Sequence, residues 1–156
     1  MSELAPLELA RCRIDVAVHW LNKQVPPFDP PEWEIEYYNI AIALELALKA
    51  WLALHGYTDE ELRRTVRHDL GKARVLAAGL GLALPPVLDP LLPLIHPFYM
   101  EGGFRRVNHI DWPEALLREV RLPLRTFFGV IADAVTRAEA ARSNCSCGSP
   151  CHRVSS

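Results

Sequence analysis

The longest mainly apolar segment of the chain runs from Ile40 to Leu54, where Glu45 and Lys49 are the two polar residues. A helix over this segment would be apolar around almost its whole circumference, which predicts that other elements enclose it. The acid precedes the base by four residues, so the two side chains stack on one face in the favourable orientation. The pattern predicts a central helix over 37–55 that carries one acid–base pair.

The segment before this helix also shows a helical pattern. Apolar residues recur every three or four positions between Leu4 and Leu21, which predicts a first helix. The prolines of 26–31 fix an extended backbone and remove amide donors, so the first helix must end by about Val25. Pro31 suits the first turn of the central helix, where proline is tolerated.

Signals for two further helices follow the central helix. Gly56 suits its C-cap. Thr58 and Glu61 have the spacing of a capping box, which predicts a short helix toward Arg67. A second helical stretch over 71–78 follows at once, and such tight connections predict antiparallel neighbours.

The second half of the chain is predicted to end in one long helix. The prolines in 85–97 cut that segment into short turns or one brief helix, and we expect 98–110 to be a loop. Later apolar positions give a helical face, within which Pro123 should kink or split the helix. Residues 143–156 show no apolar periodicity and predict a tail. We therefore expect an all-α domain over 1–142.

Length and composition narrow the class of protein. The 156 residues suit one domain whose core is large enough to need neither disulfides nor metal. Half of the residues are hydrophobic, which excludes disorder for most of the chain. The net charge of −2 creates no overall field that would attract nucleic acid or an anionic membrane. Binding to either would therefore need a local basic surface.

Two further features bear on location and cofactors. The longest uncharged run, Val75–Leu88, is shorter than the roughly 18 residues that a membrane-spanning helix needs, and the first residues lack a signal-peptide pattern. We expect a cytoplasmic protein that makes no membrane contact. The tail contains four soft metal ligands, but they lack the paired spacing of a structural zinc site. A disordered tail is therefore the favoured interpretation and metal or redox chemistry the alternative, so we predict neither metal nor cofactor. These ligands are Cys145, Cys147, Cys151 and His152.

The central part of the chain resembles the HEPN superfamily of small α-helical proteins. The matching residues are the Glu45-x-x-x-Lys49 pair within an apolar helix, then Gly56, then His68-Asp69-Leu70 at a helix start. The resemblance implies an antiparallel bundle of about four or five helices, frequently a homodimer. It also implies a role in prokaryotic defence, toxin–antitoxin or RNA-processing systems, where some members act beside a nucleotidyltransferase.

Active members of that superfamily are metal-independent ribonucleases whose motif is an arginine followed, a few residues later, by a histidine. Arg63 and His68 have this spacing. Such an arginine can hold the scissile phosphate, and the histidine can move a proton as the 2′-hydroxyl attacks. In those nucleases the motif usually lies on a late helix that faces the dimer partner, whereas here it precedes the helix over 71–78.

Several of these residues have a structural as well as a functional interpretation. Glu45 and Lys49 either orient the central helix or line a ligand cleft, where burial would perturb the pKa of each. His68 and Asp69 either cap the following helix, by satisfying its free N–H groups, or supply a proton-transfer histidine.

Two pairs of arginines complete the candidate ligand-binding residues. Arg64 and Arg67 belong to a local basic cluster, which is either a solvated face or a surface that contacts RNA. Arg105 and Arg106 lie in a segment that also contains Tyr99, a combination found in anion and nucleotide pockets.

Three functions follow from these observations. The favoured one is a non-catalytic HEPN-like accessory or binding protein, dimeric, which acts with an RNA- or nucleotide-handling partner such as a nucleotidyltransferase or an antitoxin. The second is a dimeric ribonuclease or toxin that uses Arg63 and His68. The third is a structural module whose exposed apolar surface binds another protein.

Overall fold

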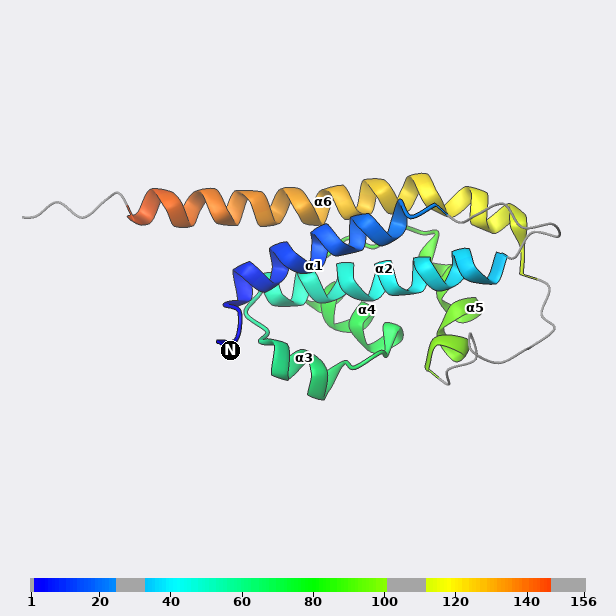
Figure 1. Cartoon of the computed structure of the whole chain (residues 1–156), viewed down its shortest axis with the longest axis horizontal. Helices are drawn as coiled ribbons and strands as arrows, with labels where there is room; N and C mark the ends of the chain where they lie inside the picture. The colour runs from blue at the N-terminus through cyan, green and yellow to red at the C-terminus, as the bar shows by residue number, and fades with distance from the viewer. Residues whose placement is uncertain (1, 25–32, 101–111, 147–156) are drawn as a thin grey trace, which may run out of the picture.

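A computed structural model describes residues 2–24, 33–100 and 112–146 of the chain (Figure 1). These residues form six helices and no strand, so the all-α prediction is confirmed. The helices are α1 (Pro6–Leu21), α2 (Trp33–Leu54), α3 (Asp59–Thr65), α4 (Leu70–Gly79), α5 (Leu88–Met100) and α6 (Glu114–Ser146). The count exceeds the expected four or five because 88–100 forms a full helix.

The predicted central helix is α2, which packs against each of the other five helices. Its apolar residues are almost all buried, and so are Glu45 and Lys49. By length and hydropathy α2 is the one helix in the described ranges that would suit a membrane span, but 72% of that window is buried inside the bundle. Such burial is typical of a core helix, because neighbouring helices take the place of lipid around it.

The axes of the three long helices, α1, α2 and α6, are roughly aligned. In Figure 1, α1 runs antiparallel to both α2 and α6, and these three form the long axis of the molecule. The shorter helices α3 and α4 lie on the side of α2 that faces away from α6. The two sides of α2 therefore present separate surfaces.

The turn after α2 forms as its sequence predicts. Gly56 has a φ of 101°, a left-handed conformation that favours glycine after a helix. The Thr58 hydroxyl accepts from the Glu61 amide at 3.2 Å, and the Glu61 carboxylate accepts from the Thr58 amide at 2.9 Å. This reciprocal capping box starts α3 directly after the turn.

Two proline-containing segments are more helical than their prolines predict. α5 contains Pro93 and Pro97, and α6 continues without a break through Pro123. Each proline removes one backbone hydrogen bond, but the helices are held by burial of their apolar faces. On α5 the buried residues are Leu88, Leu91, Leu92 and Ile95. Of the two expected effects of Pro123, a kink or a split, the split is therefore wrong.

The C-terminal boundary of α6 also differs from the expected one. The helix continues to Ser146, so the predicted domain boundary at 142 falls inside it. Near this end, Glu139 accepts from Arg11 of α1 at 2.5 Å. Residues 147–156, with Cys147, Cys151 and His152, lie outside the described ranges.

Candidate functional site

Glu45 of α2 is the centre of a cluster of polar side chains from three parts of the chain. Its carboxylate accepts from Lys49 Nζ at 2.6 Å, one helical turn further along α2. It also accepts from His68 Nδ1 at 3.1 Å, in the turn between α3 and α4. The Tyr99 hydroxyl of α5 donates to the same carboxylate. We call these four residues the Glu45 cluster.

The buried charge of Glu45 is balanced within this cluster. Glu45 and Lys49 are 6% and 5% exposed. Burial by itself would raise the pKa of Glu45, but hydrogen bonds from Lys49, Tyr99 and His68, together with the Lys49 charge, hold it below its usual value. Burial is the largest cause that raises the pKa of Tyr99, and the hydrogen bond to Glu45 is the second. The Tyr99 hydroxyl therefore keeps its proton. Glu45 is thus an ionised acceptor.

His68 connects this buried acceptor to the surface. Its side chain is 70% exposed, and its ring meets that of Tyr99 edge-on with the centroids 5.9 Å apart. Because Nδ1 faces an ionised carboxylate, Nδ1 must carry the hydrogen. Nε2 is then the ring nitrogen left for solvent or a ligand, and it can accept or release a proton.

The backbone beside His68 adopts an unfavourable conformation. Arg67 has a φ of 51°, and it is the non-glycine residue with a positive φ in the described part of the chain. A residue with a Cβ loses about 1–2 kcal/mol in this region, and such residues are concentrated at functional sites. The sharp turn at Arg67 separates α3 from α4 and precedes the histidine that contacts Glu45.

Asp69 provides the cap that was expected of His68 or Asp69. Its Oδ1 accepts from the Lys72 amide at 2.9 Å and so starts α4. The same oxygen lies 3.7 Å from His96 Nε2 of α5. The other ring nitrogen of His96, Nδ1, is buried and has no hydrogen-bond partner among the described residues. The capping interpretation thus holds for Asp69, while His68 contacts Glu45.

We expect Asp69→Ala to lower the free energy of unfolding by about 1 kcal/mol, because α4 loses its N-cap. Asp69→Asn should cost much less, since its amide oxygen can still accept from the Lys72 amide. Urea denaturation of the two variants measures the difference. Equal losses would mean that the charge of Asp69, and not the cap, supplies the stability.

Comparisons with protein-family models, with curated proteins and with solved structures found no match to this chain. The evidence for the candidate site is therefore its geometry.

Arg63 and His68 contact different parts of the structure and do not form one site. The Arg63 guanidinium lies 3.3 Å from Asp59, whose carboxylate also accepts from Arg13 of α1. Together with Leu9 of α1, Arg63 lines a pocket of about 450 Å³ that also borders the N-terminal residues. Arg63 thus belongs to the α1 side of α3, and His68 contacts α2 and α5.

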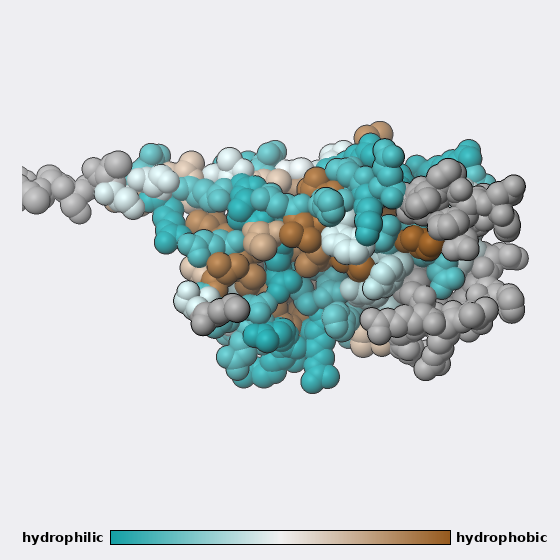
Figure 2. Space-filling view, in the orientation of Figure 1, coloured by the Kyte–Doolittle hydropathy of each residue, from teal (hydrophilic) through white to brown (hydrophobic). Residues whose placement is uncertain are grey.

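The other predicted arginines divide into two groups. Arg64 and Arg67 are exposed, and no carboxylate pairs with them in the described ranges. With His68 and Lys72 they form a polar surface around the α3–α4 turn, which we call the turn surface. Figure 2 shows that hydrophilic residues cover the molecule over α3. Arg105 and Arg106 lie outside the described residues.

Sequence reasoning did not connect Tyr99 to the site. It lies 54 residues from Glu45 along the chain, at the end of a proline-rich segment. The glutamate itself was the available signal, because a buried carboxylate needs donors beyond one lysine. Among the described residues, no three His, Cys, Asp or Glu side chains are placed to hold a metal ion.

Proposed function

We propose that this chain is a HEPN-like accessory protein that binds RNA or a nucleotide through its turn surface. It would act with a nucleotide-handling partner, such as a nucleotidyltransferase or an antitoxin. The observation that carries the proposal is the exposure of Arg64, Arg67 and His68 at one turn, with neither arginine paired to a carboxylate in the described ranges. Arginine forks match phosphate geometry, and a histidine can donate to the same group.

Most other described arginines have acidic partners, and the three that lack one, Arg125, Arg137 and Arg142, are spread along α6 and do not gather at one turn. Arg11, Arg74 and Arg121 each pair with a carboxylate at 2.5–3.1 Å. Such pairing neutralises a cation and reduces its value as a phosphate ligand. The overall charge of −2 offers no attraction for RNA, so a local group of unpaired cations is the feature required.

The Glu45 cluster supports the HEPN-like part of the proposal. Glu45, Lys49 and His68 carry the resemblance in sequence, and they are in contact in space. They also have a clear joint role, because Glu45 fixes the ring of His68 and leaves Nε2 facing outward. The resemblance and the turn surface therefore concern the same part of the molecule.

We expect Arg64→Ala/Arg67→Ala to weaken binding of a single-stranded RNA about tenfold or more at low salt. Loss of two phosphate contacts should also reduce the slope of log K against log salt by about 1.4. Filter binding across a salt series measures both quantities. The control is Arg125→Ala/Arg142→Ala on α6, which removes the same charge from exposed positions that have no carboxylate partner in the described ranges.

Two outcomes would overturn the binding proposal. One is a wild-type protein that binds neither RNA nor nucleotides at low salt. The other is equal weakening by the α3 and α6 double variants, which would indicate attraction by net charge and no defined surface.

Ribonuclease activity is the second candidate, and the Glu45–His68 contact is the observation that favours it. A carboxylate that orients a histidine leaves its far nitrogen ready for proton transfer. Because Arg63 is held by Asp59, Arg64 or Arg67 would hold the phosphate instead. Cleavage of RNA in EDTA that disappears in His68→Ala but persists in His55→Ala would select this function. His55 is an exposed histidine directly after α2, and its Nδ1 lies 2.9 Å from the Trp51 carbonyl oxygen.

A further inference from the structure

The backbone of the turn surface is fixed before any ligand binds. The Arg67 amide donates to the Leu62 carbonyl oxygen at 3.0 Å, which closes the end of α3. Glu45 holds the ring of His68 through Nδ1 at 3.1 Å, so Nε2 is the nitrogen left for a ligand. Such preorganisation lowers the cost of binding, because less freedom is lost when the ligand arrives.

The turn surface is also small, because acidic residues and paired cations border it in the described ranges. The first turn of α3 contains three acidic residues, Asp59, Glu60 and Glu61. On α4, Arg74 is the next basic residue after Lys72, and it pairs with Asp89 at 2.5 Å. Helix α5 contains neither lysine nor arginine. The arginines without a carboxylate partner on α6 lie on the other side of α2 (Figure 1).

This extent suits one phosphate group better than a row of them. Proteins that follow a single strand use a basic groove along several nucleotides. A terminal phosphate monoester instead concentrates about −1.5 to −2 of charge and three strong acceptor oxygens in one group. Arg64, Arg67 and His68 can all donate to those oxygens. We propose that the turn surface recognises a terminal phosphate monoester, at the end of an RNA chain or on a free nucleotide. The inference rests on the proposed function and names the group that is bound.

The conformation of Arg67 agrees with a role for its side chain in binding. Glycine would adopt its φ of 51° at lower cost, and the end of α3 does not require a guanidinium. The Arg67 side chain is exposed, and no carboxylate pairs with it in the part of the chain that the structure describes. Backbone strain of this kind is concentrated at functional sites, where a side chain has to be held in one place.

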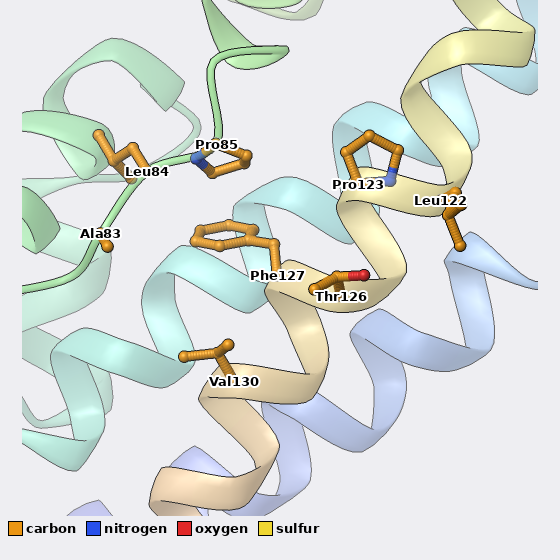
Figure 3. A pocket seen from close by; sticks show the side chains of 8 residues that line it. All are labelled: Ala83, Leu84, Pro85, Leu122, Pro123, Thr126, Phe127 and Val130. Atoms are coloured by element: carbon orange, nitrogen blue, oxygen red, sulfur yellow. The ribbon is translucent and has the colours of Figure 1, made fainter.

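Two pockets elsewhere in the described ranges suit a phosphate less well. The groove of about 480 Å³ between α6 and the segment that joins α4 to α5 has an apolar lining, and Figure 3 shows Pro85 and Phe127 directed toward one another across it. The pocket of about 450 Å³ beside α1 includes Arg63, but Glu3 and Asp59 also line it. Carboxylates repel a phosphate, so the turn surface is the best phosphate site of the three.

The test uses isothermal titration calorimetry at low salt with short RNA oligonucleotides of one sequence. The first carries a phosphate at its 5′ or 3′ end, and the second ends in hydroxyl groups. The third also ends in hydroxyl groups but is two nucleotides longer, so its charge is about that of the first. The phosphorylated form should bind about tenfold or more tightly than either of the others, because equal charge spread along a chain does not match a compact site.

AMP and adenosine distinguish the two sources of the phosphate. AMP should bind about tenfold or more tightly than adenosine, which lacks the phosphate. If AMP binds as tightly as the phosphorylated RNA, the ligand is a free nucleotide. If AMP binds much more weakly than that RNA, the ligand is the end of an RNA chain.

The variant Arg67→Gly separates recognition from folding. Because glycine is favoured at a φ of 51°, the midpoint of urea denaturation should not fall. The preference for the phosphorylated oligonucleotide should drop about tenfold, because one guanidinium is lost. The matched control is Arg142→Ala at the exposed end of α6, which removes the same charge and should keep the preference. A merely structural Arg67 would change the midpoint and leave the preference unchanged.

Three results would overturn the inference. Binding that ignores the terminal phosphate and strengthens with chain length would contradict it and leave the proposed RNA binding intact. A preference that survives Arg67→Gly would contradict the assignment to the turn surface. A protein that binds neither the oligonucleotides nor AMP would overturn the proposed function as well.

Discussion

Replacement of Glu45 by alanine is expected to lower the free energy of unfolding by about 3–5 kcal/mol. The reason is that Lys49 would remain as a buried cation, 5% exposed, without its partner. The Tyr99 hydroxyl and His68 Nδ1 would lose the same acceptor. Urea denaturation at neutral pH measures the loss.

The double variant Glu45→Leu/Lys49→Met provides the control. It removes both charges and fills a similar volume, so it should cost less than Glu45→Ala alone. If the double variant were the less stable of the two, the Glu45–Lys49 pair would contribute net stability. Its attraction would then exceed the cost of burying the two charges.

The pH dependence gives an independent readout of the same group. Because the pKa of Glu45 is lower in the folded protein than its usual value of about 4.3, its contribution is complete above that value. The contribution is lost as the pH falls through the lowered folded pKa. Wild-type protein should therefore lose more stability on acidification than Glu45→Gln does.

Phe128→Ala is expected to cost about 3–5 kcal/mol, because it empties a core position that is 1% exposed. Phe128 lies on the face of α6 that packs against the bundle, with its ring centroid 6.0 Å from that of Phe127. Its loss would loosen the contact between α6 and the rest of the bundle. Thermal or urea unfolding measures the effect.

The matched control is Val75→Ala on α4, where the side chain is 70% exposed. Removal of an exposed aliphatic group should change stability by less than about 0.5 kcal/mol. Similar losses at Phe128 and Val75 would contradict the placement of α6 against the core.

Local rules explain why so many helix ends agree with the sequence. The capping box of Thr58 and Glu61 and the left-handed Gly56 involve groups within a few residues of one another. Such interactions are present whatever the distant parts of the chain do. Local rules gave the wrong prediction for Pro93 and Pro97. The cost of a proline inside a helix is a local effect, whereas the burial of apolar side chains that outweighs this cost depends on distant parts of the chain.

The candidate site divides in the same way. The spacing of Glu45 and Lys49 predicted their contact, because four residues make one turn of a helix. Arg63 and His68 had the spacing of a nuclease motif, but the turn at Arg67 directs them to different neighbours. Spacing in sequence predicts contact inside a regular element and loses that power once a turn intervenes.

The sequence by itself determined that an apolar helix carrying one acid–base pair forms the centre of an all-helical protein. Hydrophobic periodicity suffices for this, because a helix without a polar face must be enclosed. The tertiary structure alone decided that Tyr99 and His68 meet Glu45, and that Leu122 and Val130 stay exposed on α6. The contacts at Glu45 join residues far apart in the chain, and the exposure of Leu122 and Val130 depends on which face of α6 the other helices cover. Both are therefore decided by how whole helices pack and not by neighbouring residues.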